Sequence, residues 1–496
     1  MTSTLSPSPV RAARVTAPWV VLVLVCAAQF MVVLDATIVN VALPSIRRGL
    51  NFSEGDLQWV VNSYTLVFGG FLLLGGRAAD LFGRKRLFLT GIALFSVASV
   101  INALATSPGM LIAGRGLQGL GGALVSPAAL SIITTTFAEG RERTRALGVW
   151  SGIAAGGGAV GLLLGGILTD VASWQWVFIV NVPIGALALL LSLRFVPESR
   201  VESGHRGVDV GGAVLVTGGL MVAVYAIVEA TSSGWTSGRT LGLGALAVTM
   251  LVAFLVVETR VAAPLMPLRL FRIRSLAGSN AAMFLAVAGL FAMFFFCTIY
   301  VQDVLGYSPI RAGFAFLPVA LSIGVGAGLA QVAIRFLGIR GVALLGMGMG
   351  AVGLLSLVRI STDGSYLTQL LPGLLVLAIG MGLLFVPITL MATTNIDASD
   401  AGLASGLLNT AQQVGGALGL AVLSTVATSR TTGIIGALSH APSAGDLSGA
   451  EVDGFRLAFL VGAVMMGLAA AVLGLVVRGR HIANATAGAP ALPEAA

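Results

Sequence analysis

Long apolar segments alternate with short polar loops along almost the whole chain. Most are about 20 residues long, the length that an α-helix needs to cross the hydrocarbon core of a bilayer. Strands of a membrane β-barrel would instead appear as alternating segments of about ten residues. The pattern therefore predicts fourteen membrane-spanning helices. They lie near residues 18–43, 57–75, 87–106, 109–132, 146–169, 175–196, 209–230, 240–257, 276–301, 312–334, 341–360, 367–391, 402–428 and 455–477.

The loops after the second and the tenth segments share a pattern. In residues 77–84 and again in residues 335–340, a glycine (Gly83, Gly338) lies between two basic residues of a short turn. Both turns join the second and third spans of a six-span block if spans seven and eight are an insertion. Two related six-helix halves are typical of the major facilitator fold. We therefore expect an all-α polytopic membrane protein of this fold, with its 14 transmembrane helices arranged 6 + 2 + 6.

The predicted spans divide the chain into five parts. These are a cytoplasmic N-terminal arm (1–17), an N-terminal six-helix bundle (18–200), two inserted helices with cytoplasmic linkers (201–275), a C-terminal six-helix bundle (276–478) and a cytoplasmic tail (479–496). The apolar run after the arm is too long for the core of a signal peptide, so we expect it to remain as the first span.

Composition supports the membrane assignment. Of the 496 residues, 57% are hydrophobic and only 10% are charged, and the mean hydropathy is +0.98. Soluble domains have about 25% charged residues, so this low value excludes a soluble enzyme, a disordered chain and a nucleic-acid binder. The 66 glycines favour closely packed helices, because small residues let helices approach each other in lipid.

The basic residues predict the orientation. Of the 28 lysines and arginines, 20 lie in segments on one side, 7 lie in segments on the other, and Arg115 alone lies inside a span. Because basic loops remain in the cytoplasm, we expect both termini to be cytoplasmic. All basic residues except Lys85 are arginine, a bias that suggests a bacterial source. The expected location is the bacterial cytoplasmic (inner) membrane.

Motifs for enzymatic chemistry are missing from the sequence. It contains no phosphate-binding loop, no H-E-x-x-H, no C-x-x-C and no G-x-S-x-G. We therefore expect no enzyme activity, no catalytic residues, no metal site and no cofactor. The two cysteines, Cys26 and Cys297, lie in separate apolar segments and suggest no disulfide framework.

Two ionisable residues lie well inside predicted spans. An ionisable group at such a position suggests a functional site. Asp35 is in the middle of the first span, where a buried carboxyl that opens onto a water-filled cavity could bind and release a proton. The alternative is a carboxyl bonded permanently to a neighbouring helix. Other acids, such as Asp303 and Glu258, lie near the ends of spans, where solvation at the membrane interface is the simpler interpretation.

Several sequence segments together resemble the 14-helix drug:proton antiporters of the major facilitator superfamily. The resemblance covers the whole chain except its two ends. It includes the first-helix segment Leu34 to Pro44, the loop 76–86, and the fourth-helix segment Leu111 to Gly119. It also includes Trp174-Gln175-Trp176 with Asn181 to Gly185, Tyr300 to Pro309, and Gly402 to Gly419.

The resemblance implies roles for particular residues. Asp35 and Arg115 would couple transport to protons, with the Arg115 charge modulating the proton affinity of the carboxyl. This role requires that the two residues lie close together; a structural tie between helices is the alternative for Arg115. The loop residues Gly76, Asp80, Gly83 and Arg84 would form a conformational gate that locks the two halves together when the cytoplasmic side is closed.

The fifth span departs from the antiporter pattern. Gly157, Gly161, Gly165 and Gly166 have the spacing of the antiporter-type glycine helix, but Leu162 stands where the family has proline. Leucine keeps the packing face of the helix and loses the kink that proline would add. Simple close packing therefore stays open as an alternative. A second departure is Gln175, where the family often has arginine.

The substrate site of such a transporter lies between the halves near the midplane. Polar, aromatic and methionine side chains on the second, ninth and thirteenth spans suit a pocket that accepts many shapes; core packing or lipid contact is the alternative for each. The candidates are Trp59, Asn62, Tyr64, Asn280, Phe284, Phe291, Phe295, Tyr300, Asn409 and Gln413.

The expected function is proton-coupled export of amphipathic drugs, antibiotics or dyes by alternating access. The expected partners are a small amphipathic substrate, protons and the lipid bilayer, with no nucleic acid, and the chain is expected to act as a monomer. Transport would be driven by the proton gradient. Two alternatives stay open: a proton-independent or importing metabolite facilitator of the same fold, and a membrane sensor or scaffold that transports nothing.

Overall fold

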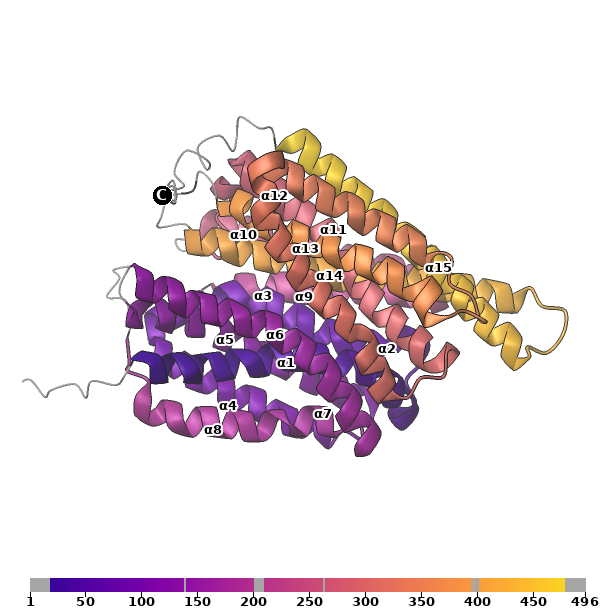
Figure 1. Ribbon diagram of the computed structural model, residues 1–496, viewed down its shortest axis with the longest axis horizontal. Coiled ribbons are helices and arrows are strands. Elements are labelled where there is room, and N and C mark those ends of the chain that lie inside the picture. The colour runs from indigo at the N-terminus through magenta and orange to yellow at the C-terminus, as the bar shows by residue number, and fades with distance from the viewer. Residues whose placement is uncertain are drawn as a thin grey trace, which may run out of the picture.

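The computed structural model describes residues 18–137, 140–199, 209–261, 264–393, 396 and 401–477. The predicted N-terminal arm (1–17) and cytoplasmic tail (479–496) lie outside these residues. Within the described ranges every regular element is a helix. The helices form two bundles that lie along each other, the first coloured indigo to magenta and the second salmon to yellow (Figure 1).

The first bundle contains the first six predicted spans. Its helices are α1 (Pro18–Leu50), α2 (Glu54–Leu57), α3 (Trp59–Phe82), α4 (Arg84–Ala103), α5 (Pro108–Thr136), α6 (Arg141–Val171), α7 (Trp176–Ile179) and α8 (Asn181–Phe195). The short helices α7 and α8 together form the sixth span. They are separated at Val180 because Pro183 has no backbone N–H to donate to the carbonyl one turn earlier.

The inserted helices and the second bundle complete the chain. The insertion is α9 (Val210–Ser233) and α10 (Gly238–Arg260), followed by the 3₁₀ helix η1 (Leu268–Arg272). The second bundle contains α11 (Arg274–Ile299), the π-helix η2 (Tyr300–Val304), α12 (Pro309–Leu357), the π-helix η3 (Tyr366–Leu370), α13 (Leu371–Thr393), α14 (Ala401–Gly436) and α15 (Ala444–Val476).

These helices account for the fourteen predicted crossings. Twelve are long and apolar enough to span a membrane when α12 is taken as one helix. At 49 residues, a straight α12 would be about 74 Å long, more than twice the thickness of a bilayer core. It bends at Gly338 (φ 68°, ψ 164°) and so provides two spans. Helix α6, with 31 residues and an apolar segment over Gly156–Val171, supplies the fourteenth.

The repeated loop pattern of the sequence corresponds to a repeated structure. Gly83 (φ 109°) turns the chain between α3 and α4, and Gly338 (φ 68°) turns it between the two arms of α12. Two residues after each glycine, a basic side chain donates to a carbonyl near the end of its bundle's sixth span. Lys85 Nζ lies 2.8 Å from the carbonyl of Leu193, and Arg340 donates over 2.6 Å to the carbonyl two residues before the end of α15. Carbonyls at helix ends lack intrahelical partners, so a cation suits them.

The two bundles meet along two seams. In one seam α3 packs against α14, and in the other α6 packs against α12. In each case the second span of one bundle contacts the fifth span of the other, so the two seams are related by the same pseudo-symmetry. The inserted helix α9 packs on both α3 and α14, beside the first seam (Figure 1). The inserted helices therefore lie beside the α3–α14 seam, and the two seams have different surroundings.

Candidate functional site

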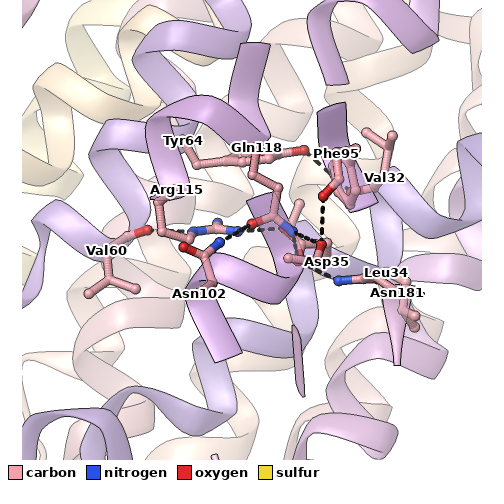
Figure 2. Close-up of polar contacts among 12 residues, drawn as sticks. Val32, Leu34, Asp35, Val60, Tyr64, Phe95, Asn102, Arg115, Gln118 and Asn181 are labelled. Atoms are coloured by element: carbon pink, nitrogen blue, oxygen red, sulfur yellow. Dashed lines mark hydrogen bonds and ion pairs between the residues drawn. The ribbon is translucent and has the colours of Figure 1, made fainter. Parts of the chain in front are cut away.

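Asp35 lies in the middle of α1 with no solvent exposure, and its carboxylate receives three hydrogen bonds. Arg115 Nη1 donates to Oδ2 over 2.5 Å. Gln118 Nε2 and Asn181 Nδ2 donate to Oδ1 over 2.7 and 2.8 Å. Figure 2 shows Arg115 and Gln118 reaching Asp35 from one side and Asn181 from the other. All three contacts on the carboxylate are therefore hydrogen-bond donors, and one of them is a cation.

Arg115 is as deeply buried as its partner. Its side chain is 2% exposed, and its Nε donates to the carbonyl of Val60 over 2.9 Å. Its Nη1 also donates to Gln118 Oε1 over 2.7 Å. The guanidinium lies over the ring of Tyr64, 4.3 Å from the ring centroid. The cation is thus held by α1, α3 and α5 together, which compensates for part of the cost of burying it.

A second set of polar side chains surrounds this pair. Gln118 Nε2 also donates to the Ser99 hydroxyl over 2.9 Å, and Asn102 Nδ2 donates to Gln118 Oε1 over 2.8 Å. All of these residues are fully buried or nearly so. We call Asp35, Ser99, Asn102, Arg115, Gln118 and Asn181 the polar cluster. It joins α1, α4, α5 and α8, so a change in the charge of Asp35 acts on four helices at once.

Local sequence explains how the polar cluster is assembled. Arg115 and Gln118 are three residues apart on α5, and Ser99 and Asn102 are three apart on α4, so each pair shares one helix face. Gly119 allows α5 to approach α3, because a Cβ there would collide with the backbone of Tyr64. Asn181 begins α8 next to the break at Val180.

The structure brings Asp35 and Arg115 together, the proximity that the proton-coupling hypothesis requires. Sequence reasoning gave no role to Gln118 or Asn181, although both lie in segments that carry the family resemblance. It missed Ser99 and Asn102 entirely. A usable signal was present for three of them: Ser99 and Asn102, and Gln118 with Arg115, are polar residues three positions apart in apolar spans.

The predicted gate residues lie at the turn between α3 and α4. A Cβ on Gly76 would lie 3.5 Å from Pro127 of α5, in ordinary contact. The carboxylate of Glu198 accepts from the backbone N–H of Lys85 over 3.1 Å, and the backbone N–H of Arg84 donates to the carbonyl of Ser199 over 2.9 Å.

These bonds tie the turn to the segment after α8, within the first bundle. A Cβ on Gly83 would lie 2.7 Å from Glu198 Oε1, so this carboxylate would have to shift, and the φ of 109° disfavours any residue but glycine here. The side chain of Asp80 lies outside the described part of the structure. The role of these residues as a gate stays a prediction.

The glycines of the fifth span lie at helix crossings. Gly157, Gly161 and Gly165 face α1, where added Cβ atoms would meet Val33, Thr37 and Ile38. These α1 residues flank Asp35, so the glycine face supports the helix that carries the buried carboxyl. Gly166 faces the other bundle, with its Cβ position 2.5 Å from the carbonyl of Pro309. Leu162 is buried beside Gly313 of α12. An antiport-specific role for these glycines stays a prediction.

Several substrate candidates have structural partners in this conformation. Tyr64 stacks on Phe68 and lies against Arg115, and Trp59 packs beside Tyr225 of α9. Asn62 is buried, 3.4 Å from Gln58 Oε1. Asn280 Nδ2 and Tyr300 Oη donate to the backbone carbonyls of Leu276 and Ser361.

The remaining candidates lie on α11 and α14. The backbone of Phe284 and the ring of Phe291 pack against Gly415 and Gly416 of α14. Phe295 lines a cavity of about 20 Å³ between α1, α11, α14 and α15, large enough for about one water molecule. Asn409 is exposed and Gln413 is half-buried, with their side chains 3.5 Å apart. Substrate contact by any of the ten residues stays a prediction.

Ion pairs join the two bundles at the end of the molecule where α1 and α11 terminate. Asp303 accepts from Arg47 over 2.8 Å and from Arg48 over 3.0 Å. Arg47 also lies 3.6 Å from Glu451 of α15. Gln302 Nε2 donates to the carbonyl of Val41 over 2.7 Å. On the orientation that the basic residues predict, this is the outer end of the molecule.

The expectation that solvent surrounds Asp303 at the membrane interface is wrong, whereas the interfacial position expected for Glu258 stays a prediction. The side chain of Asp303 is 13% exposed because two arginines of the other bundle cover it. Glu258 is 5% exposed, and its carboxylate accepts from the backbone N–H groups of Leu265 and Met266. Each acid ties two segments together, which the sequence spacing did not reveal.

Comparison with known proteins places this fold in a family. Residues 25–420 match the family model described as Major Facilitator Superfamily. The chain is 42% identical to the puromycin resistance protein pur8 of Streptomyces alboniger over 473 residues, 93% of each chain. It is 43% identical to the cephamycin export protein CmcT of Amycolatopsis lactamdurans over 426 residues, 85% of this chain and 88% of the relative.

A solved structure shows the same fold. It is a bacterial homologue of the human lysosomal transporter Spinster in an inward-facing, unoccupied conformation, with a TM-score of 0.66 and 20% identity. The match covers 94% of this chain and 98% of that chain. Together, the sequence matches, the two six-helix bundles and the fourteen crossings lead to one assignment. This multi-pass membrane protein belongs to the major facilitator superfamily, in the group of its antibiotic-resistance and drug-efflux transporters.

Proposed function

We propose that the protein exports amphipathic drugs, antibiotics or dyes in exchange for protons, by alternating access across the bacterial cytoplasmic membrane. The observation that carries the proposal is the buried pair of Asp35 and Arg115 at the centre of the first bundle. Its similarity to a puromycin resistance protein and to a cephamycin export protein supports the direction of transport and the class of substrate.

The contacts suggest how the exchange is ordered. In the conformation described, ion pairs join the ends of the bundles at Asp303, and Asp35 accepts hydrogen bonds from three donors, the partners of a carboxylate. A deprotonated site belongs to the step in which the proton has left to the cytoplasm and substrate is taken up from there. Separation of Arg47 and Arg48 from Asp303 would open the outer side, where a proton binds and substrate leaves.

Other parts of the proposal follow from the same cycle. Both termini lie in the cytoplasm, and one chain suffices because each bundle supplies one side of the path. The proton gradient drives transport, so no cofactor is required and nucleic acid plays no part. The expected substrate is neutral or carries one positive charge. The reason is that α14, the helix of the second bundle that packs against α3, has no carboxylate over Ala401–Gly436.

The test uses purified protein in liposomes with an acidic interior and ethidium as the probe. One pH unit is worth about 1.4 kcal/mol, so one-for-one exchange of a proton for this monocation supports about tenfold accumulation. We expect wild-type protein to accumulate ethidium and Asp35→Asn to fail, while ethidium exchange without a gradient persists in both. Uphill accumulation by Asp35→Asn equal to that of wild type would show that Asp35 is not the coupling site.

A second candidate function, a proton-independent or importing facilitator, is favoured by one observation. Leu162 stands where the family has proline, and it is buried at the crossing of α6 and α12. Without the kink of proline, the coupling between the fifth span and α1 can differ from that of an antiporter. Ethidium counterflow in the wild type that ignores the pH gradient would support this function and contradict proton-coupled export.

A further inference from the structure

The protonated form of Asp35 needs a hydrogen-bond acceptor that the present contacts do not offer. All three side chains that touch its carboxylate are donors: Arg115, Gln118 and Asn181. A protonated carboxyl carries an O–H that must find an acceptor when it is buried. Any proton-carrying transporter built on this site must therefore rearrange at least one partner when the proton binds.

Arg115 and Gln118 cannot supply that acceptor. A guanidinium has only donors. The amide oxygen of Gln118 already accepts from Arg115 Nη1 over 2.7 Å and from Asn102 Nδ2 over 2.8 Å. Its nitrogen also donates to the Ser99 hydroxyl over 2.9 Å. Rotation of this amide by about 180° would place its NH₂ group against the donors of Arg115 and Asn102. The contacts of both its oxygen and its nitrogen therefore fix its orientation.

Asn181 has the freedom that Gln118 lacks. Its Nδ2 donates to Asp35 Oδ1 over 2.8 Å, while its Oδ1 is buried without a hydrogen-bond partner. Rotation of the amide by about 180° would exchange the two atoms and place Oδ1 against the carboxyl. Before the rotation Oδ1 has no partner, and after it Nδ2 has none. The number of hydrogen bonds that the amide makes is therefore the same in both orientations. Asn102 also has an unpartnered Oδ1, but that amide bonds to Gln118 and not to Asp35.

We propose that Asn181 is a positioning residue that serves both protonation states of Asp35. Its NH₂ group holds the carboxylate, and its carbonyl oxygen accepts the O–H after Oδ1 binds a proton. The Arg115 contact on Oδ2 persists, weakened from an ion pair to a bond between a cation and a neutral carbonyl. The charged or titratable groups that face Asp35 from the packed helices are Arg115 and Tyr64.

This inference rests on the proposed function, since it assumes that Asp35 takes up a proton. Asn181 begins α8 directly after the proline-induced break at Val180. Rotation of its amide therefore takes place in a turn of the sixth span that lacks one backbone hydrogen bond, the one that Pro183 cannot donate to Ile179. Through its contact with Asp35, Asn181 links a change in the charge of that carboxyl on α1 to the position of α8.

The test is an infrared pH titration of the purified, full-length protein without substrate. The carbonyl band of protonated Asp35 is assigned by its loss in Asp35→Asn. In wild-type protein with ¹⁵N-labelled asparagine side chains, we expect an amide signal that changes at the same pH midpoint. That signal should vanish in Asn181→Leu and persist in Asn102→Leu, whose buried amide does not touch Asp35.

The midpoint in Asn181→Leu separates two roles. If Asn181 served both states, leucine removes one hydrogen bond from each, and the proton affinity rises by no more than about fivefold, a midpoint shift of at most about 0.7 pH unit. If Asn181 only donated to the charged carboxylate, leucine would raise the proton affinity more than about tenfold, a midpoint shift of more than about 1 pH unit.

Such a shift, or a titrating carboxyl band without an asparagine signal in labelled wild type, overturns the proposal. The labelled wild type decides the question even if Asn181→Leu does not fold. Absence of any Asp35 band that titrates between pH 4 and about 9 would instead contradict the proton-coupling function itself.

Discussion

Neutralising Asp303 tests whether ion pairs hold the two bundles together at the ends of α1 and α11, which the proposed orientation places outside. Asp303 is 13% exposed and contacts Arg47 and Arg48, whose side chains are 22% and 60% exposed. An exposed pair contributes about 0.2–1 kcal/mol, and a partly buried charged hydrogen bond about 1.5 kcal/mol. Asp303→Asn leaves the Arg47–Glu451 pair in place, so we expect a net loss of about 1–2 kcal/mol for the closed outer end.

That loss corresponds to a five- to thirtyfold increase in the ratio of outer-open to outer-closed molecules. The assay is pulsed electron resonance between spin labels at Ser107 and Ser365, exposed positions near the starts of α5 and α13 in different bundles. The native cysteines, both buried, are replaced by serine in the labelled protein. We expect the population at long distance to grow in Asp303→Asn.

The matched control is Asp453→Asn. Asp453 is paired with Arg456 three residues later on the same helix, so its loss breaks an ion pair without separating the bundles. The distance distribution of this variant should match that of the parent. Equal distributions in all three proteins would refute the idea that the Asp303 contacts stabilise outer closure.

Three further predictions concern other parts of the structure. Gly161→Ala should destabilise the protein by about 1–3 kcal/mol, because its Cβ would collide with Thr37. The control Gly152→Ala, with open space around its Cβ position, should not lower the melting temperature. Equal melting temperatures for the two variants would contradict the α1–α6 packing. Arg340→Met should cost about 1.5–3 kcal/mol in thermal unfolding by removing the bond to the end of α15; an unchanged melting temperature would show that this bond is dispensable. Arg115→Lys keeps the charge but cannot reach all of its partners at once, so proton-driven ethidium uptake should fall at least tenfold; uptake at the wild-type rate would mean that charge alone suffices.

Much of the fold was predictable from the sequence because apolar length and basic-residue placement act locally. Each span is recognised from its own 20 residues, and Gly83 and Gly338 mark equivalent turns through the same basic–Gly–basic pattern. The conformation of Gly338 also explains why one continuous helix, α12, makes two crossings. These features can be predicted without knowing which helices contact each other.

The candidate site was only partly predictable because it depends on contacts between distant segments. The cost of burying a charge singled out Asp35 and Arg115, which are 80 residues apart and ion-paired. Asn181 is 146 residues from Asp35, and nothing local distinguishes its amide from other polar groups near a span end. The prediction that Asp303 is solvated was wrong for the same reason, since its partners Arg47 and Arg48 are more than 250 residues away.

The central claim, that Asp35 carries the coupling proton, is tested most directly by following protons during downhill transport. Liposomes containing the pH dye pyranine start at equal pH on both sides, and ethidium is added outside. Wild-type protein should expel protons as ethidium enters, so the internal pH rises, whereas Asp35→Asn should exchange ethidium with no pH change. A rise in internal pH with Asp35→Asn as fast as with wild type would contradict the account.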